Sequence, residues 1–546
     1  MVIKIKFKNM PEMTVEPMTT AYELLEKINF PNKDTVVACR VNKLQRSLSW
    51  KLSMDSCVDF VTTDSIEGIE VYQRTLSFML TSAATRMLGL KLHLSQSMNQ
   101  SYFYVSTENP ITHDQLDIIF NEMQRMVKDG TLIERKVVSM DEARAIMTSQ
   151  GYDDKERLLS WTGNDPVTLY KCEGIYDFFA QAPAFTAAIV PVFDLHLYEG
   201  GIYLSGPTLN DHTKVVSLKV DKKVFAILQD YSKWLEHLSV GTMDHVHNLV
   251  AHGHSRDFIM LSEARHTKML STITEEIENR TEVRLICLAG PSSSGKTTTS
   301  RRLRIHLLAS CIDSETLELD NYFVDRSSTP KDSDGNYDFE ALEALDIKLI
   351  NEHLIALLAG EEVCVPKFDF MTGKRRKGYN LKLRPGQLLL IEGIHGLNEK
   401  LTENISNEKK YRIFIGPLTG TNLDRHNRIG TTDTRLLRRM VRDNCKRGHL
   451  PEMTLKQWPS VVRGSFKHIF PYQENSEMIF NSALAYELPV LKGYVLPMLK
   501  SISENSPVYG EAQRLLSLLQ YVPIILPDNV PNISILREFI GGSCFE

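Results

Sequence analysis

The sequence lacks closely spaced cysteines, a long uncharged apolar segment and any repeated or low-complexity tract. Its eight cysteines are scattered singly, with no CxxC pair, which favours reduced, mostly buried thiols over a disulfide framework or a zinc site. No stretch supplies the roughly 18 uncharged apolar residues of a membrane span, because the best candidate, residues 178–193, is interrupted by Pro183 and Pro191. We therefore expect a cytoplasmic protein without a membrane segment.

A strong charge of either sign is also absent, since 63 Lys and Arg face 68 Asp and Glu and leave a formal net charge of -5. The balance excludes a polybasic nucleic-acid binder as a description of the whole chain, although one domain could carry a local basic face. A hydrophobic content of 42% argues against disorder. The 546 residues exceed what one core usually serves, so roughly three domains of about 150 residues are expected.

The first 62 residues follow the order strand, turn, helix and strands. Residues 1–8 alternate apolar and basic side chains as an edge strand does, and they lack the apolar core of a secretory signal. A helix is expected around Thr20–Ile28, and strands are expected over 35–42 and 57–63. This order predicts a small mixed sheet with one helix packed on it.

The rest of the chain changes pattern twice. A helix is expected over 71–88, followed by mixed strands and helices to about residue 235, with short strands within 171–204. From Arg280 onwards, short apolar runs alternate with helical patterns such as residues 339–358. This alternation indicates a parallel sheet covered by helices, and hence an α/β fold.

The sharpest local signal is GPSSSGKT, which starts at Gly290, follows the apolar run 285–289 and opens a helix over 298–308. Backbone N–H groups of such a loop converge on phosphates, and the helix N-terminus adds positive potential. Lys296 would reach the outer phosphates and Thr297 would ligate magnesium; the alternative is a plain glycine-serine turn. The expected nucleotide contacts are Gly290, Ser292, Ser293, Ser294, Gly295, Lys296, Thr297 and Thr298.

Two acids follow strands that should end at the same edge of the sheet. Asp320 ends a short strand, where a carboxylate could accept the proton of an attacking hydroxyl, or could merely cap the next helix. Glu392 closes the apolar strand 388–391 and has the pattern of a magnesium-binding acid, with a helix cap as the alternative.

Four arginines, Arg435, Arg438, Arg439 and Arg442, fall at i, i+3, i+4 and i+7 on one helical face. Arg447 continues the basic run into an expected loop. Because the stripe shares a domain with a phosphate loop, we favour a lid that closes over a triphosphate. A solvated face or an RNA-binding stripe are the alternatives.

Two further features stay open. Five histidines precede the last domain, and the i, i+2 spacing of some of them suits one face of a strand: His245, His247, His252, His254 and His266. They are linker or interface residues in our interpretation, with a metal site as the alternative. Residues 534–542 resemble an apolar helix ended by glycine, which we expect to dock on the preceding domain, with a functional role of Arg537 as the alternative.

From about Arg280 to Leu491 the order of motifs resembles the uridine-cytidine kinase branch of the phosphoribulokinase-like P-loop kinases. The blocks are GPSSSGKTT, LDNYF, NYDFEALEALD, PKFDF, LLIEGIHGLN and TDTRLLRRMVRDNCKRG. The resemblance implies an enzyme that uses ATP or GTP and Mg²⁺ to phosphorylate a nucleoside 5′-hydroxyl, with uridine to UMP in pyrimidine salvage as the first candidate.

The resemblance also implies residue roles. Asp320 falls on the catalytic base, Glu392 on the magnesium-binding acid, and Lys296, Arg442 and Arg447 on the residues that contact the phosphates. The implied substrate residues are Asp338 and Arg439 at the ribose, and Phe368 and Gln457 at the nucleoside.

Three positions depart from the kinase pattern: Phe368 replaces a tyrosine, Gly373 a histidine and His449 an arginine. Because a polar pocket discriminates by its hydrogen bonds, the loss of two polar groups leaves the acceptor open. Another sugar-like or pantothenate-like hydroxyl is therefore the second hypothesis.

The front of the chain resembles the N-terminus of threonyl-tRNA synthetases, with a TGS domain over 1–62 and the editing-type domain over 63–235. The resemblance rests on four short sequence segments: Arg40–Lys43, Glu67–Val71, Val167–Tyr170 and Tyr176–Phe178. The family's HxxxH aligns with Arg74 and Phe78, and its later Cys and His fall in 179–185, which contains neither. The resemblance therefore implies that hydrolytic editing is lost.

The same combination is familiar from bacterial proteins described as uridine or nucleoside kinases, and it implies five segments. These are a TGS-like β-grasp-like α+β domain (1–62), an α+β editing-like domain (63–235), a connector (236–280), a P-loop kinase domain with a parallel sheet (281–500) and a docking segment (501–546). A third hypothesis is an RNA- or ribosome-associated ATPase whose N-terminal domains contact RNA. The nucleotide preference and the oligomeric state, a homo-oligomer included, stay open.

Overall fold

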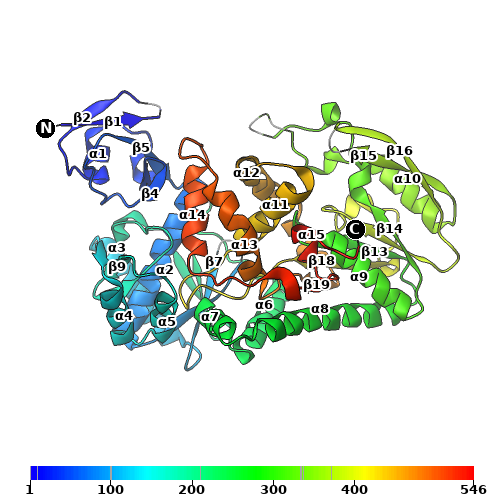
Figure 1. Cartoon of the computed structure of the whole chain (residues 1–546), viewed down its shortest axis with the longest axis horizontal. Helices are drawn as coiled ribbons and strands as arrows, with labels where there is room; N and C mark the ends of the chain where they lie inside the picture. Colours follow the sequence, from blue (N-terminus) through cyan, green and yellow to red (C-terminus); the bar gives the residue numbers. More distant parts are fainter. Residues whose placement is uncertain are drawn as a thin grey trace.

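The computed structural model describes residues 2–8, 10–98, 101–209, 211–332, 335, 337–369 and 372–545. Asn336 and Phe370, which belong to two of the kinase-like blocks, lie outside the described residues. Figure 1 shows the first sheet at one end of the long axis and the strands after residue 285 toward the other end. Among the described residues, no helix is both long and apolar enough to cross a bilayer.

The N-terminal sheet has the order β2-β1-β5-β3-β4, and the described residues of this region form one α-helix beside it, as expected. Its elements are β1 (Ile3–Phe7), β2 (Met13–Val15), α1 (Ala21–Lys27), β3 (Val36–Val41), β4 (Leu44–Arg46) and β5 (Ser56–Thr62). The expectation of an edge strand for residues 1–8 is wrong, because β1 pairs with both β2 and β5. The alternation instead reflects a sheet with one buried face: Ile3 and Ile5 are buried, while Lys4 and Lys6 are exposed.

Two antiparallel sheets follow, in the orders β11-β12-β7-β6 and β10-β9-β8, and they share an apolar core with the long helix α2. The elements are α2 (Ile66–Leu88), β6 (Leu92–Met98), β7 (Ser101–Ser106), α3 (His113–Lys128), β8 (Ile133–Val138), α4 (Met140–Ser149), α5 (Asp153–Ser160), β9 (Val167–Cys172), β10 (Ile175–Asp177), β11 (Asp194–Tyr198), β12 (Gly201–Ser205) and α6 (Lys222–His237). The short strands expected within 171–204 are confirmed. Helix α2 begins earlier than expected because Ser65 Oγ accepts from Gly68 N at 3.1 Å and caps it.

Helices α7 (Met243–Ala251) and α8 (Ser255–Glu278) lead to the last sheet. His245 and His247 lie on α7, so the strand-face interpretation of their spacing is wrong; the buried residues of this segment recur at helical spacing instead. His247 Nε2 lies 3.1 Å from Tyr521 O, and His266 Nε2 donates to Ala483 O at 3.1 Å. These two histidines therefore contact segments distant in sequence, as interface residues do.

The C-terminal half contains a five-stranded sheet in the order β14-β17-β13-β18-β19, and its pairings are parallel, which confirms the α/β prediction. The elements of this half are β13 (Leu285–Ala289), α9 (Lys296–Ala309), β14 (Ser314–Glu318), α10 (Ile347–Leu358), β15 (Val363–Asp369), β16 (Lys374–Leu381), β17 (Leu388–Glu392), β18 (Lys410–Gly416), α11 (Thr431–Arg447), α12 (Pro451–His468), β19 (Met478–Asn481), α13 (Glu487–Lys500), α14 (Tyr509–Leu519) and α15 (Arg537–Ile540). Strands β15 and β16 pair antiparallel in a separate two-stranded sheet. Strand β13 lies in the middle of the five-stranded sheet, between β17 and β18, so the loop that follows it emerges at the centre of the sheet edge.

The helix expected over 339–358 begins only at Ile347. Residues 342–344 form a short 3₁₀ turn, and Asp346 Oδ1 then accepts from Leu349 N at 3.1 Å. The Asp346 cap starts the helix after the turn, which is why the apolar pattern alone placed the start too early.

The C-terminal segment docks on the helices around the last sheet, as expected. Ile535, Leu536 and Phe539 are fully buried, and α15 ends at Gly541, whose φ is +86°. Arg537 donates to backbone carbonyls of the preceding loop, which assigns it a structural role.

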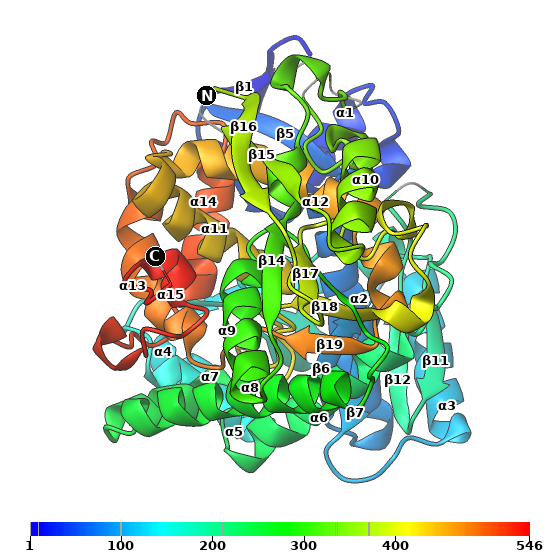
Figure 2. The same ribbon diagram turned by 90° about the vertical axis from the view of Figure 1, so that its right-hand side faces the viewer.

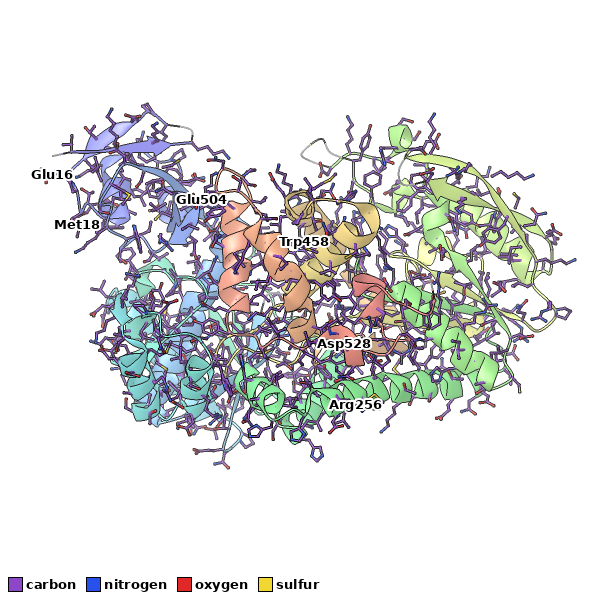
Figure 3. All side chains as sticks on the ribbon, viewed as in Figure 1. Glu16, Met18, Arg256, Trp458, Glu504 and Asp528 are labelled. Carbon is purple, nitrogen blue, oxygen red and sulfur yellow. The ribbon has the colours of Figure 1, made fainter. Side chains whose placement is uncertain are left out.

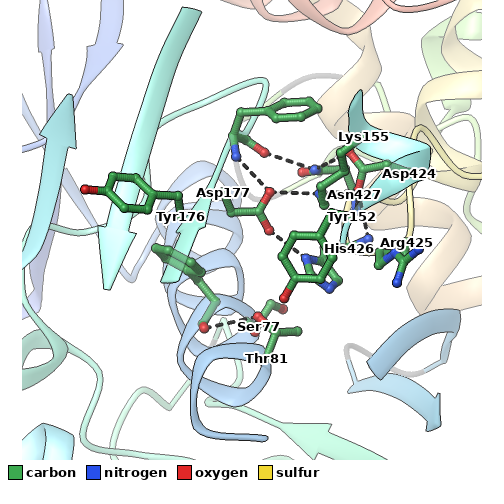
Figure 4. A network of polar contacts seen from close by, with 12 residues as sticks. Ser77, Thr81, Tyr152, Lys155, Tyr176, Asp177, Asp424, Arg425, His426 and Asn427 are labelled. Atoms are coloured by element: carbon green, nitrogen blue, oxygen red, sulfur yellow. Dashed lines mark hydrogen bonds and ion pairs between the residues drawn. The ribbon is translucent and has the colours of Figure 1, made fainter. Parts of the chain in front are cut away.

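A buried ionic network joins the N-terminal half to the loop before α11 (Figure 4). Lys155 on α5 is fully buried and its ammonium donates to Asp177 at 2.8 Å and to Asp424 at 2.6 Å. His426 Nδ1 lies 2.6 Å from Asp177 Oδ2, and Arg425 Nε donates to Asp154 at 2.8 Å. The residues of the 424–427 turn are thus anchored in the preceding region.

A second link lies at the first sheet. Figure 3 labels Glu504 beside that sheet, where Lys43 Nζ donates to Glu504 O at 2.6 Å. Both links tie the C-terminal half to residues far earlier in the chain.

Candidate nucleotide-binding site

The loop from Gly290 to Lys296 follows the buried strand β13 and opens α9, which confirms its strand-loop-helix context. A Cβ at Gly290 would lie 2.1 Å from Ile415 O, so only glycine fits there. Ser293 and Gly295 have φ of +63° and +88°, which turn the chain sharply before the helix. Among the described residues the buried hydroxyls of Ser293 and Ser294 have no partner, as expected of a loop that receives a polar ligand.

Side chains from outside the loop donate hydrogen bonds to its backbone carbonyls. Arg435 Nε donates to Ser292 O at 3.1 Å, Arg438 Nη1 to Ser293 O at 3.4 Å, and Ser482 Oγ to Ser294 O at 2.6 Å. With three successive carbonyls fixed, the peptide units between them keep one orientation, and so do their N–H groups.

Arg435 and Arg438 are therefore neither part of a lid nor a solvated face, and both expectations are wrong for them. Their side chains are 1% and 0% exposed. Arg438 pairs with the buried Glu487 at 2.6 Å, and the Arg435 guanidinium lies 5.3 Å from the ring of Trp458. Figure 3 labels Trp458. Because α11 is buried on the arginine side as well as the apolar side, the i, i+3, i+4, i+7 pattern here marks a packed face.

The other three arginines gather on Asp443, which the sequence analysis missed. Asp443 is fully buried and pairs with Arg439 at 3.2 Å, Arg442 at 3.1 Å and Arg447 at 3.4 Å. Arg439 Nη1 also donates to Ser292 Oγ at 3.1 Å, on the phosphate loop. The available signal was the spacing, since Asp443 lies four residues from both Arg439 and Arg447.

Two acids, Glu392 and Asp320, interact with the charge of Lys296. Glu392 Oε1 accepts from Thr297 Oγ1 at 3.1 Å, and burial raises the pKa of Glu392 to about 8, with Lys296 opposing and Asp320 adding to the rise. Asp320 lies in the turn Leu319–Tyr322, just after β14. Desolvation raises the pKa of Asp320, while Lys296, Arg447 and Arg442 oppose that rise. The sheet thus brings Asp320, Glu392 and the cations into one site.

The donor set at Thr297 and Glu392 fits magnesium. A hydroxyl and a carboxylate are the hard oxygen ligands that Mg²⁺ prefers, and a divalent cation would stabilise the ionised form of a buried acid. No group of three or more His, Cys, Asp or Glu within the described ranges is arranged to hold a metal. Thr297 and Glu392 would therefore be the protein residues that hold such an ion.

The implied substrate residues are less closely grouped. Asp338 lies 3.9 Å from His468, Phe368 is buried against Phe323 at 5.5 Å between ring centroids, and Gln457 is exposed on α12. The contacts found for Arg439 run to the loop and to Asp443, so the structure does not pair Arg439 with Asp338.

Gly373 and Glu340 lie in segments expected on the substrate side. Gly373 has no side chain, whereas Glu340 has a buried carboxylate. Gly373 adopts φ of +68° and its carbonyl accepts from Arg326 N at 2.8 Å. Glu340 was missed by the sequence analysis. Burial raises its pKa against the opposing Arg439, Arg435 and Lys296, and its Oε2 is buried without a partner in the described part of the chain. Glu340 therefore belongs to the electrostatic surroundings of the site.

In the N-terminal half, the positions aligned with metal ligands meet in space but carry other chemistry. Arg74 Nη1 donates to Ala182 O at 3.0 Å, and Phe78 packs edge-on against Phe179 at 5.3 Å. A guanidinium and two phenyl rings supply neither a metal ligand nor a proton shuttle at neutral pH.

The two halves of the chain are similar to different known proteins. The profile of the Phosphoribulokinase / Uridine kinase family matches residues 285–486. A uridine kinase of Deinococcus deserti is 30% identical over 179 residues, which cover 33% of this chain and 77% of that protein. A uridine kinase of Halobacterium salinarum is 28% identical over 196 residues, 36% of this chain and 78% of that protein.

A threonine–tRNA ligase of Thermotoga neapolitana is 27% identical over 242 residues, which cover 43% of this chain and 37% of the ligase. This likeness agrees with the TGS-like and editing-like resemblance of the N-terminal region. Among solved structures, a possible uridine kinase from Bacillus stearothermophilus shares 16% identity, with a TM-score of 0.25 and coverage of 38% of this chain and 99% of that one.

Proposed function

The chain belongs to the phosphoribulokinase / uridine kinase family, and from that premise we propose that it transfers the terminal phosphoryl group of ATP to the 5′-hydroxyl of a nucleoside, with uridine as the first candidate. The observation that carries the proposal is the meeting of a phosphate loop, a Thr297–Glu392 pair and Asp320 at one sheet edge. The loop binds phosphates, the pair suits Mg²⁺, and the acid suits an attacking hydroxyl.

In the proposed reaction the loop amides and Lys296 bind the phosphates, while Thr297 and Glu392 would hold Mg²⁺. The bound ion would neutralise charge on the phosphate oxygens. Asp320 accepts the proton of the acceptor hydroxyl on a carboxylate oxygen as that hydroxyl attacks. Arg442 and Arg447, gathered by Asp443, offset the charge of the transferring group.

Asp338 and Phe368 are proposed to face the acceptor, with Gln457 and Arg439 at the margins. Phe368 is buried against Phe323, so it presents an apolar wall and no hydrogen-bonding edge. A pocket of this kind supports binding of a small hydroxyl compound but gives little discrimination between bases. For the N-terminal half, we propose that hydrolytic editing is absent.

The test is a screen for ADP formation by the purified full-length chain with a panel of nucleosides, related alcohols and RNA, using ATP or GTP. The proposal expects one nucleoside to stimulate ADP formation and to yield its monophosphate in equal amount. A response to another alcohol would keep the kinase and change its acceptor. A response to RNA alone would overturn the proposal in favour of an RNA-stimulated ATPase.

A further inference from the structure

The C-terminal segment lies directly on the phosphate loop. A Cβ on Gly295 would lie 2.4 Å from Ile535 Cγ2, so the side chain of Ile535 covers that glycine. Phe539 is fully buried, with the Arg438 guanidinium 5.2 Å from its ring. Figure 2 shows α15 close to α9 and α11. The segment therefore touches both the loop and Arg438, one of the two arginines that hold it.

One side chain of this segment occupies donors of the loop. Glu538 Oε2 accepts from Thr298 N at 3.1 Å and from Thr298 Oγ1 at 2.8 Å. Thr298 lies in the first turn of α9, where backbone N–H groups have no partner within the helix. The positive potential of the helix N-terminus stabilises a carboxylate at this point.

A nucleotide would need the same donors. The N–H groups at the start of the helix that follows a phosphate loop bind the phosphate oxygens of the nucleotide. The Thr298 amide can donate one strong hydrogen bond, so a phosphate oxygen and the Glu538 carboxylate exclude each other there. The Glu538 charge also acts on Glu392, whose pKa it helps to raise, so Glu538 adds a further anion to the surroundings of the expected phosphate site.

We propose that Glu538 competes with the phosphates of the nucleotide for Thr298, so that nucleotide binds only when the Glu538 carboxylate leaves the N-terminus of α9. The proposal rests on the proposed function insofar as the loop is taken to bind a nucleotide. The apparent affinity for nucleotide is then the intrinsic affinity multiplied by the fraction of molecules in which Thr298 is free. Because hydrogen bonds to charged groups are among the stronger ones, removal of the carboxylate should tighten nucleotide binding roughly tenfold.

The experiment measures binding of ADP and of a non-hydrolysable ATP analogue by calorimetry, with full-length protein and without an acceptor. The variants are Glu538→Ala and Glu538→Gln, and the matched control is Asp528→Asn, an exposed acid of the same segment (Figure 3). Thermal melting of each variant reports folding. If the alanine variant melts far below the wild type, the glutamine variant, which keeps the side-chain size, is decisive.

Tighter binding by the Glu538 variants, with Asp528→Asn at the wild-type value, is the expected result. Unchanged or weaker binding in a folded Glu538 variant would overturn the proposal and leave Glu538 as a cap of α9. Failure of the proposed kinase function is a separate outcome, because these titrations contain no acceptor. If wild type and variants alike bind no nucleotide, the competition proposal and its premise are both rejected.

Discussion

Replacement of Arg438 by methionine tests how the phosphate loop is held. Arg438 is fully buried, pairs with Glu487 at 2.6 Å, and donates to the carbonyls of Ser293 at 3.4 Å and Ser482 at 2.8 Å. Methionine fills much of the same volume but leaves the buried Glu487 carboxylate without a cation. Breaking a buried pair in this way lowers the free energy of unfolding by about 3–5 kcal/mol.

A second substitution separates stability from positioning. In the double variant Arg438→Met with Glu487→Gln, the uncompensated charge is gone, so most of the lost unfolding free energy should return. The carbonyls of Ser293 and Ser482 still lack their donor. Two lost hydrogen bonds of about 1 kcal/mol each should leave nucleotide binding at least about tenfold weaker than in the wild type.

The assays are denaturant unfolding followed by tryptophan fluorescence and calorimetric titration with ADP. Arg438→Met alone is expected to lose stability and affinity, and the double variant to recover stability only. A double variant that binds ADP as tightly as the wild type would refute the role of Arg438 in orienting the loop. Wild-type stability of the single variant would refute the energetic argument for the Arg438–Glu487 pair.

Three further predictions concern other parts of the molecule. Lys155→Met should lower the unfolding free energy by about 3–5 kcal/mol, since it strands Asp177 and Asp424; a denaturation midpoint equal to that of the wild type would contradict this. Burial lowers the pKa of His266 to about 3, so protonation of the unfolded chain below its pKa of about 6.5 lowers the free energy of unfolding, by about 2 kcal/mol at pH 5. His266→Gln should therefore lose less stability than the wild type when the pH falls from 7 to 5. Parallel pH profiles of stability for the two proteins would rule the effect out. Lys296→Ala should weaken ADP binding in calorimetry whatever the acceptor, and unaltered affinity would remove Lys296 from the phosphate site.

The phosphate loop and the two acids could be predicted from sequence because their signals are local. Gly290, Lys296 and Thr297 lie within eight residues after an apolar run, and Glu392 follows directly on another. Parallel strands carry such residues to a common edge, so local patterns sufficed.

Burial of the arginine stripe could not be read from spacing. A helical period identifies a face but does not say what packs on it, and α11 is covered on both its apolar and its arginine sides. The start of α10 was misplaced for a related reason, since the apolar pattern continues through a 3₁₀ turn.

Long-range polar contacts were beyond sequence reasoning for a different cause. Thr298 and Glu538 lie 240 positions apart, and Lys155 and Asp424 lie 269 apart. The sequence around a carboxylate has no periodic pattern that indicates which donor or cation it will contact. These pairs are therefore seen only in the folded structure.

The central claim is most directly tested by comparing wild type and Asp320→Asn in one coupled measurement of ADP formation and nucleoside monophosphate, with uridine first in the panel. The account predicts acceptor-dependent ADP formation by the wild type, monophosphate in equal amount, and loss of both in Asp320→Asn, which still binds ADP in calorimetry. Undiminished turnover by Asp320→Asn, or ADP formation that no nucleoside or alcohol stimulates, would contradict it.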